Sequence, residues 1–145
     1  MATVELSFSA LPVHVRTARL VAAAVARRAG VDEALLDEIR LAVGEACSRA
    51  VHLHLRYCPQ VPVRIALTDE PPGFEVVVYD QSPTGDPQDS SDALEDLAEA
   101  LDLPSSPLPA GVGLAVVSSL VDDVDIATGK TGAAVTMRWP ILVRL

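Results

Sequence analysis

The chain has 145 residues, half of them hydrophobic, which is enough for one domain around a single core. Its formal net charge of −9 argues against nucleic acid or an anionic membrane as a partner, because both would repel an acidic surface. No apolar stretch reaches the roughly 18 residues of a membrane span, and the N-terminus lacks the pattern of an export signal, so we expect a cytoplasmic protein.

The first part of the chain predicts one strand and two helices. Residues 4–9 alternate apolar and polar side chains, which is typical of a half-buried strand. Apolar residues recur at spacings of three and four over residues 12–29, which predicts an amphipathic helix that stops at Gly30. Asp32 is a good N-cap residue for a second amphipathic helix over residues 33–54.

A hairpin and a long irregular segment follow. Residues 63–68 and 74–79 read as strands and are joined by turn residues, which predicts an antiparallel pair. Residues 82–111 are rich in proline, serine and acidic side chains. A connection of this length is unusual in a small domain unless it serves as a lid or a binding segment. We therefore expect a lid there, within one domain that spans residues 1–145.

The last part predicts a helix over residues 113–122 and strands over residues 124–128 and 133–139. The order of elements is then strand, two helices, two strands, lid, helix and two strands. This order predicts an α+β sandwich, in which the helices near residues 12–29, 33–54 and 113–122 cover one face of a mixed sheet.

One stripe of the second predicted helix is polar. Glu38, Glu45, Arg49 and His52 follow one another at spacings of seven, four and three, so they lie on one side of a helix. The stripe has two interpretations. It is either a solvated face on which Glu45 and Arg49 form an exposed ion pair, or part of a functional site.

Glycines and one acid add a second pattern. Asp80 directly follows a predicted strand, Gly111 and Gly113 open the last predicted helix, and Gly132 precedes the last strand. A helix N-terminus entered through glycines offers backbone N–H groups and a positive dipole end to a phosphate. A single Gly-x-Gly is weak evidence, but the acid, the glycines and the polar stripe in this order are more specific.

These features resemble anti-sigma factors of the bacterial serine-protein kinase type, a branch of the GHKL (Bergerat-fold) ATPase and kinase superfamily. The similarity covers nearly the whole chain and is carried by LSFSAL (6–11), TARLVAAAV (17–25), DEIRLAVGEACSRAV (37–51), VVVYD (76–80), AGVGLAVV (110–117), SLVDDVDI (119–126) and TGAAVTM (131–137). The resemblance implies a Bergerat fold that binds ATP or ADP.

The resemblance also implies roles for individual residues. Glu45 matches the glutamate that helps to activate the attacking serine of an antagonist protein. Asp80 matches the aspartate that reads the adenine amino group, and Gly111 and Gly113 match the glycines that cradle the phosphates. Arg49 stands where the family has the asparagine that holds Mg²⁺.

Arg49 does not suit that role. A guanidinium has five N–H donors and no acceptor, so it cannot be a magnesium ligand, and we expect no Mg²⁺ site. Two alternatives remain for Arg49. It approaches a phosphate directly, or it clamps Glu45, lowers the pKa of that carboxylate and blocks the site.

Further departures weaken the nucleotide site. Ser82 replaces a glycine two residues after the aspartate, and Ala134 stands at the expected place of a threonine whose hydroxyl supports the aspartate. No lysine or arginine occurs between Arg64 and Lys130, whereas acidic residues are frequent there, so a triphosphate would be repelled. Trp139 is expected in the core, and His14 and His54 on the surface.

Two function classes follow. The first is a regulator that sequesters a sigma factor, is controlled by an anti-anti-sigma antagonist protein and forms a homodimer. The second is an active serine-protein kinase that phosphorylates this antagonist. Arg19 matches an arginine that the family uses to grip its protein partner, and the alternative is a surface arginine whose stem covers apolar neighbours.

Overall fold

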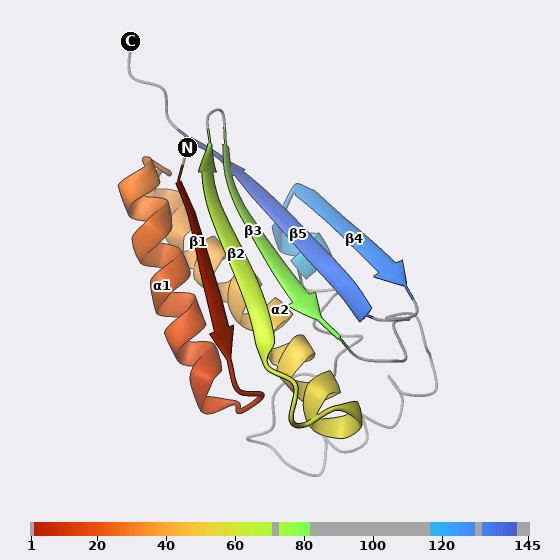
Figure 1. The fold of residues 1–145 in the computed structure, drawn as a ribbon. Helices are drawn as coiled ribbons and strands as arrows, with labels where there is room; N and C mark the ends of the chain where they lie inside the picture. Colours follow the sequence, from red (N-terminus) through yellow and green to blue (C-terminus); the bar gives the residue numbers. More distant parts are fainter. Residues whose placement is uncertain (1, 71–72, 82–116, 130–131, 142–145) are drawn as a thin grey trace.

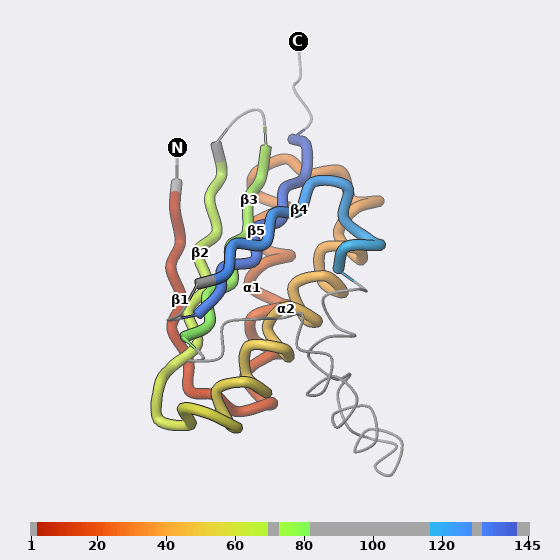
Figure 2. The backbone as a smooth tube through the Cα atoms, turned by 90° about the vertical axis from the view of Figure 1, so that its right-hand side faces the viewer, coloured from red at the N-terminus to blue at the C-terminus, as the bar shows by residue number. Residues whose placement is uncertain are grey.

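The computed structural model describes residues 2–70, 73–81, 117–129 and 132–141. Within these residues, five strands form one sheet and two long α-helices lie across one of its faces (Figure 1). Figure 2 shows the two layers from the side, with the strands on one side and the helices on the other. This arrangement confirms the predicted α+β sandwich with its helices on one face.

The two helices follow their predicted bounds closely. Helix α1 spans Val13–Ala29 and ends at Gly30, which adopts the left-handed conformation with φ 98°. The Asp32 side chain accepts a hydrogen bond from the Ala34 N–H at 3.0 Å and so caps a short 3₁₀ turn, η1, at Glu33–Leu35. Helix α2 then spans Leu36–Tyr57 with Leu35 at its N-cap and no side-chain cap. Asp32 therefore caps the 3₁₀ turn that leads into α2, and not α2 itself as the sequence predicts.

The sheet contains β1 (Ala2–Phe8), β2 (Val63–Glu70), β3 (Gly73–Asp80), β4 (Asp123–Gly129) and β5 (Gly132–Pro140), in the order β1-β2-β3-β5-β4. All four described pairings are antiparallel, so the expectation of a mixed sheet is wrong for this part of the chain. Helices α1 and α2 lie between β1 and β2 along the chain, and β2 runs antiparallel to β1.

The last predicted helix is described only in part. Residues 117–120 are helical, and the Val121 N–H donates to the Val117 carbonyl at 3.0 Å. Residues 113–116 lie outside the described residues, as do the predicted lid at residues 82–111 and the two glycines Gly111 and Gly113.

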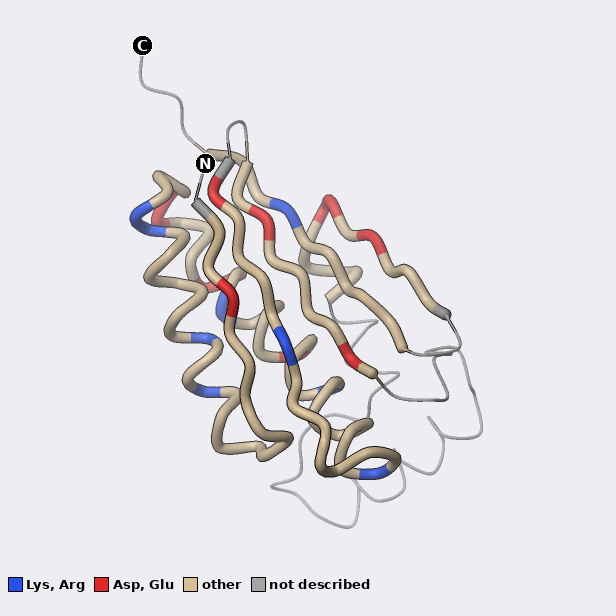
Figure 3. Tube along the Cα trace, viewed as in Figure 1, with Lys and Arg blue, Asp and Glu red and all other residues tan. Residues whose placement is uncertain are grey.

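Charge is unevenly distributed over the two layers (Figure 3). Helix α1 contains four arginines and no acidic residue, although the whole chain has a net charge of −9. On the sheet, Arg138 of β5 donates to Asp123 and Asp125 of β4 at 3.0 and 2.9 Å. The outer side of α1 is therefore a basic region on an acidic protein.

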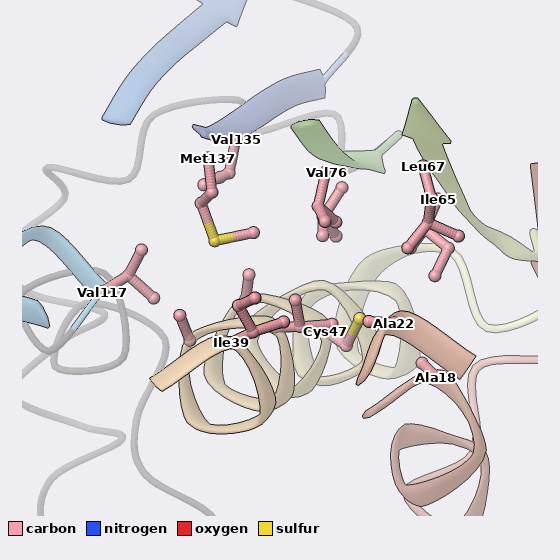
Figure 4. Packing of buried hydrophobic residues seen from close by; sticks show 14 of the residues in the cluster. Ala18, Ala22, Ile39, Cys47, Ile65, Leu67, Val76, Val117, Val135 and Met137 are labelled. Carbon is pink, nitrogen blue, oxygen red and sulfur yellow. The ribbon is translucent and has the colours of Figure 1, made fainter. Parts of the chain in front are cut away.

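The core lies between the helices and the sheet. Ala18 and Ala22 of α1 are buried and small, which lets the helix backbone approach its neighbours closely. In Figure 4, Met137 of β5 extends from the sheet toward Ile39 of α2. Trp139 is buried as predicted, and its indole Nε1–H donates to Glu38 Oε2 at 2.7 Å. Among the described helices, none is long and apolar enough to cross a membrane.

Candidate functional site

A buried ion pair joins α2 to the end of β3. The Nη1 of Arg49 donates to Oδ2 of Asp80 at 2.6 Å, and the two side chains are only 2% and 1% exposed. Residues of β3 alternate in burial, so the side chain of Asp80 points toward the helices, as do those of Phe74, Val76 and Val78. The pair therefore lies where the helix layer covers the C-terminal end of β3.

This pairing corrects the expectation that Arg49 clamps Glu45. Asp80 is carried into the interior by the strand, and a desolvated carboxylate is costly unless a cation and hydrogen bonds compensate it. Glu45 is only partly buried, so solvent can compensate its charge without a cation. The arginine therefore compensates the more deeply buried acid. Its own Nε–H is buried and has no hydrogen-bond partner among the described residues, so the contact is less than fully satisfied.

Glu45 has a different electrostatic environment from the one predicted. Burial raises the pKa of its carboxyl group, and the charge of Arg19 on the neighbouring helix opposes that rise. The prediction of a lowered pKa is wrong, because the cation expected beside Glu45 is engaged by Asp80 instead. Glu45 is thus a better proton acceptor than the sequence indicated.

Arg19 crosses from α1 onto α2 at a glycine. A Cβ atom added to Gly44 would lie 2.6 Å from Cδ and 3.2 Å from Cγ of Arg19, so the arginine stem occupies the space that a side chain at residue 44 would need. Arg19 as a whole remains exposed. Its stem covers α2 while its charge stays accessible, so the geometry is compatible with both sequence-based interpretations of this residue.

His54 is buried, which contradicts the predicted surface position. The Gln81 N–H donates to Nε2 at 2.8 Å, and Nδ1 lies 2.8 Å from the Val61 carbonyl oxygen. A backbone N–H can only donate and a carbonyl can only accept, so the ring is neutral with its proton on Nδ1. His54 thereby fixes the chain immediately after Asp80. The signal was present in the sequence, because His54 continues the buried stripe through Val43 and Ala50.

The start of β5 passes close to the same strand end. A Cβ atom on Gly132 would lie 2.0 Å from the carbonyl oxygen of Asp80, and the φ of Gly132 is 141°, a conformation that favours glycine. Ala133 pairs with Asp80, whereas Ala134 pairs with Tyr79 and therefore faces the other side of the sheet. The match of Ala134 to a supporting threonine stays a prediction, and its side chain lies on the other face of the sheet from that of Asp80. Ala133, which pairs with Asp80, has no hydroxyl group either.

The contacts of Arg49 and Asp80 limit which ligands the site could bind. Arg49 supplies only N–H donors, so nothing at residue 49 could ligate a hard cation. The described residues contain no group of three or more histidine, cysteine, aspartate or glutamate side chains placed to hold a metal ion. The carboxylate of Asp80 is already engaged by a cation. These residues do not fit a magnesium nucleotide.

A separate cavity lies at the far end of the sheet. It has a volume of about 680 Å³, and Phe74, Trp139 and Glu38 are among the residues that line it. Phe74 stands near the start of β3 and Asp80 at its end, so the cavity is separate from the Arg49–Asp80 pair.

Comparison with known proteins agrees with this architecture. The model of the histidine kinase-like ATPase domain matches residues 8–139, which is most of the sequence. The chain belongs to the histidine kinase-like ATPase domain family. In that family context, Arg49 and Asp80 occupy the region in which the sequence predicted a nucleotide site. No curated protein matches the chain.

A solved structure shows the same fold. The chain is similar to the crystal structure of the RsbU and RsbW domains of Rv1364c from Mycobacterium tuberculosis, with 18% identity and a TM-score of 0.64. The match covers 95% of this chain and 32% of the other, so the chain corresponds to about a third of that protein.

Proposed function

We propose that this protein is an anti-sigma factor-like regulator that sequesters a sigma factor by docking and is controlled by an antagonist protein, without phosphoryl transfer. The Arg49–Asp80 ion pair carries the proposal, because it occupies both side chains around which a family nucleotide site would be built. The proposal includes a cytoplasmic homodimer as the working form.

Adenine recognition is the first step that the pair obstructs. An amino group that bonded to Asp80 would compete with a guanidinium at 2.6 Å. Displacing Arg49 would leave a charge, 2% exposed, without its counter-ion. Separating a buried pair in this way costs about 3–5 kcal/mol, which corresponds to a loss of roughly two to four orders of magnitude in affinity. We therefore propose that ATP and ADP bind weakly at best.

Magnesium is the second obstacle. Phosphoryl transfer depends almost entirely on positioning and on neutralising the charge of the transferred group, which metal ions usually provide. Arg49 cannot take the place of the missing asparagine as a ligand. We propose that Mg²⁺ plays no part in this protein, and that Gly111 and Gly113, which lie outside the described residues, no longer serve a bound triphosphate.

Partner binding is assigned to α1. This helix is basic in an acidic protein, and it exposes large apolar side chains at Val13 (69%) and Leu20 (57%) beside its arginines. Apolar anchors next to an arginine are typical of protein interfaces, and an arginine can bind a carboxylate through two hydrogen bonds. We propose that Arg19 contacts an acidic segment of the sigma factor.

An active serine-protein kinase is the second candidate function, and one observation favours it. Burial raises the pKa of Glu45, which moves this carboxylate toward the proton affinity that a general base needs. Retained proton transfer would still require bound nucleotide, so this candidate depends on ATP reaching the site despite the Arg49–Asp80 pair.

The test separates the two candidates. Purified protein is mixed with sigma factors and with candidate antagonists, with labelled ATP and Mg²⁺ or with no nucleotide. The proposal expects capture of a sigma factor at equal affinity in both conditions, and no serine phosphate on any antagonist. Transfer of label that disappears in Glu45→Ala would establish the kinase instead, and failure to bind any sigma factor would refute both forms of partner switching.

A further inference from the structure

The cavity at the end of the sheet away from Asp80 has both apolar and acidic walls. Its volume of about 680 Å³ lies within the range of roughly 300–1,000 Å³ that is usual for small-molecule sites. The apolar part of the lining comes from Leu35 of η1, from Pro140, and from the buried residues Phe74 and Trp139, whose ring centroids are 6.2 Å apart. The cavity can therefore hold the apolar body of a small organic molecule.

Carboxylates outnumber cations around this cavity. Of the described residues that line it, one is basic, Arg138, and four are acidic: Glu38, Glu75, Asp122 and Asp123. Arg138 of β5 lies in register between Glu75 of β3 and Asp123 of β4, and its guanidinium contacts the two carboxylates at 3.5 and 3.0 Å (Figure 3). One guanidinium thus serves several carboxylates, and the negative charge around the cavity exceeds the positive charge.

Two side-chain donors of the lining, those of Trp139 and Arg138, already have acceptors. The indole Nε1–H, the only donor of the Trp139 side chain, donates to Oε2 of Glu38 at 2.7 Å. Nη1 of Arg138 donates to Asp123 and Asp125 at 3.0 and 2.9 Å. A carboxylate can accept about four hydrogen bonds through its two oxygens, so Glu38 retains acceptor capacity beside the cavity. A matching ligand must therefore bring hydrogen-bond donors and a positive charge.

These acids do not suit a metal ion. Within the part of the chain that the structure describes, no three histidine, cysteine, aspartate or glutamate side chains are placed together to hold one. A bare ion would also leave most of a cavity of about 680 Å³ unfilled. The cation that fits the cavity is larger and carries apolar surface of its own.

We propose that the cavity binds a small organic cation, a molecule with an ammonium or amidinium group on an apolar body. Glu38 binds the cationic group, and the apolar body packs against Leu35 and Pro140. Hydrogen bonds between a charged donor and a carboxylate are the strong ones, so Glu38 sets the preference for a cation. This binding requires neither a sigma factor nor a nucleotide, because the cavity is separate from the Arg49–Asp80 pair.

The first experiment uses Trp139, the only tryptophan of the chain, whose indole N–H gives one signal in the ¹⁵N-labelled protein. The signal is followed while the protein is titrated with 2-phenylethylamine or benzamidine, and with 2-phenylethanol and phenylacetate as probes without a positive charge. Both cations should shift the signal saturably, and the other two probes should bind at least about tenfold more weakly. No saturable shift with either cation up to about 20 mM, or equal binding of the alcohol, would overturn the proposal.

The second experiment compares variants at constant ionic strength. Glu38→Gln keeps an acceptor for the Trp139 N–H but removes the charge, so it should weaken the binding of 2-phenylethylamine about tenfold or more. Glu33→Gln removes the same charge from the exposed η1 turn, outside the cavity lining, and should leave the affinity unchanged. Asp122→Asn, at an exposed position of the lining, should weaken binding about twofold.

Equal affinity in Glu38→Gln and the wild type would contradict the role of Glu38. A loss in Glu33→Gln as large as that in Glu38→Gln would contradict it too, because the effect would then come from net charge alone. The amide spectrum of each variant shows whether it is folded. Should Glu38→Gln not fold, unchanged binding in Asp122→Asn decides against the proposal.

Discussion

Asp80 at the end of β3 accepts a hydrogen bond from Arg49 of α2 at 2.6 Å, in an environment that exposes neither side chain by more than 2%. An arginine at this helix position thus stabilises a carboxylate that is buried at the end of a strand. This ion pair compensates the cost of burying the Asp80 carboxylate.

Arg49→Met should destabilise the protein by about 3–5 kcal/mol, because it leaves the carboxylate of Asp80 buried and without its cation. Urea denaturation measures the loss. The double variant Arg49→Met with Asp80→Leu removes both charges and should recover much of the stability, since two apolar side chains of similar volume can replace a buried pair. A double variant as unstable as Arg49→Met would show that the unpaired charge of Asp80 does not cause the loss of stability.

His54→Phe should cost about 1–3 kcal/mol, because the ring is replaced by one of similar shape that leaves the Gln81 N–H and the Val61 carbonyl without a partner. Chemical denaturation gives the magnitude. The ¹⁵N chemical shifts of the imidazole provide an independent check: Nδ1 should show the shift of a protonated nitrogen and Nε2 that of an acceptor. The reverse assignment would contradict the hydrogen bonds described.

Glu45→Gln should make the folded protein more stable near pH 7, by less than about 1 kcal/mol because the side chain is only partly buried. The folded-state pKa of Glu45 lies above the ordinary 4.5, so the cost of ionising it in the fold appears as pH rises through that value. The advantage of the variant should therefore vanish at acidic pH below about 4. Thermal unfolding of the wild type and Glu45→Gln between acidic and neutral pH measures the difference in stability. A stabilising effect of the variant that grew on acidification would contradict a raised pKa of Glu45.

Gly132→Ala should be strongly destabilising, since the new Cβ would lie 2.0 Å from the Asp80 carbonyl oxygen at a φ of 141°. Strain of this kind costs about 1–3 kcal/mol before the clash is relieved. Gly73→Ala is a matched control in the same sheet, because its Cβ would meet the Trp139 carbonyl oxygen at 3.1 Å. Denaturation curves should show a larger loss of stability for Gly132→Ala than for Gly73→Ala. Equal losses would contradict the close approach of residue 132 to the Asp80 carbonyl oxygen.

Hydrophobic periodicity is sufficient to place α1, α2 and the β2–β3 hairpin, because each of these depends on local spacing. The partner of Arg49 could not be found in this way. Glu45 lies four residues away on the same helix, while Asp80 is 31 residues away and becomes its neighbour only when β3 packs against α2. Helical spacing names candidates for contact, but burial decides which acid needs the cation.

The wrong prediction for His54 has a simpler cause. His54 was assigned to the surface by its polarity, although it continues the apolar stripe of α2 and finds two backbone partners there. Strand register is a second feature that local spacing does not give. A shift of one residue changes the face of a strand, and the register places Ala133 opposite Asp80.

The measurement that tests the account most directly is calorimetric titration of the wild-type protein with ATP, with and without Mg²⁺. Because Arg49 holds Asp80 and offers no metal ligand, we predict dissociation constants weaker than about 1 mM that do not improve when Mg²⁺ is present. Binding in the micromolar range that depends on Mg²⁺ would contradict the claim that this pair has replaced the nucleotide site.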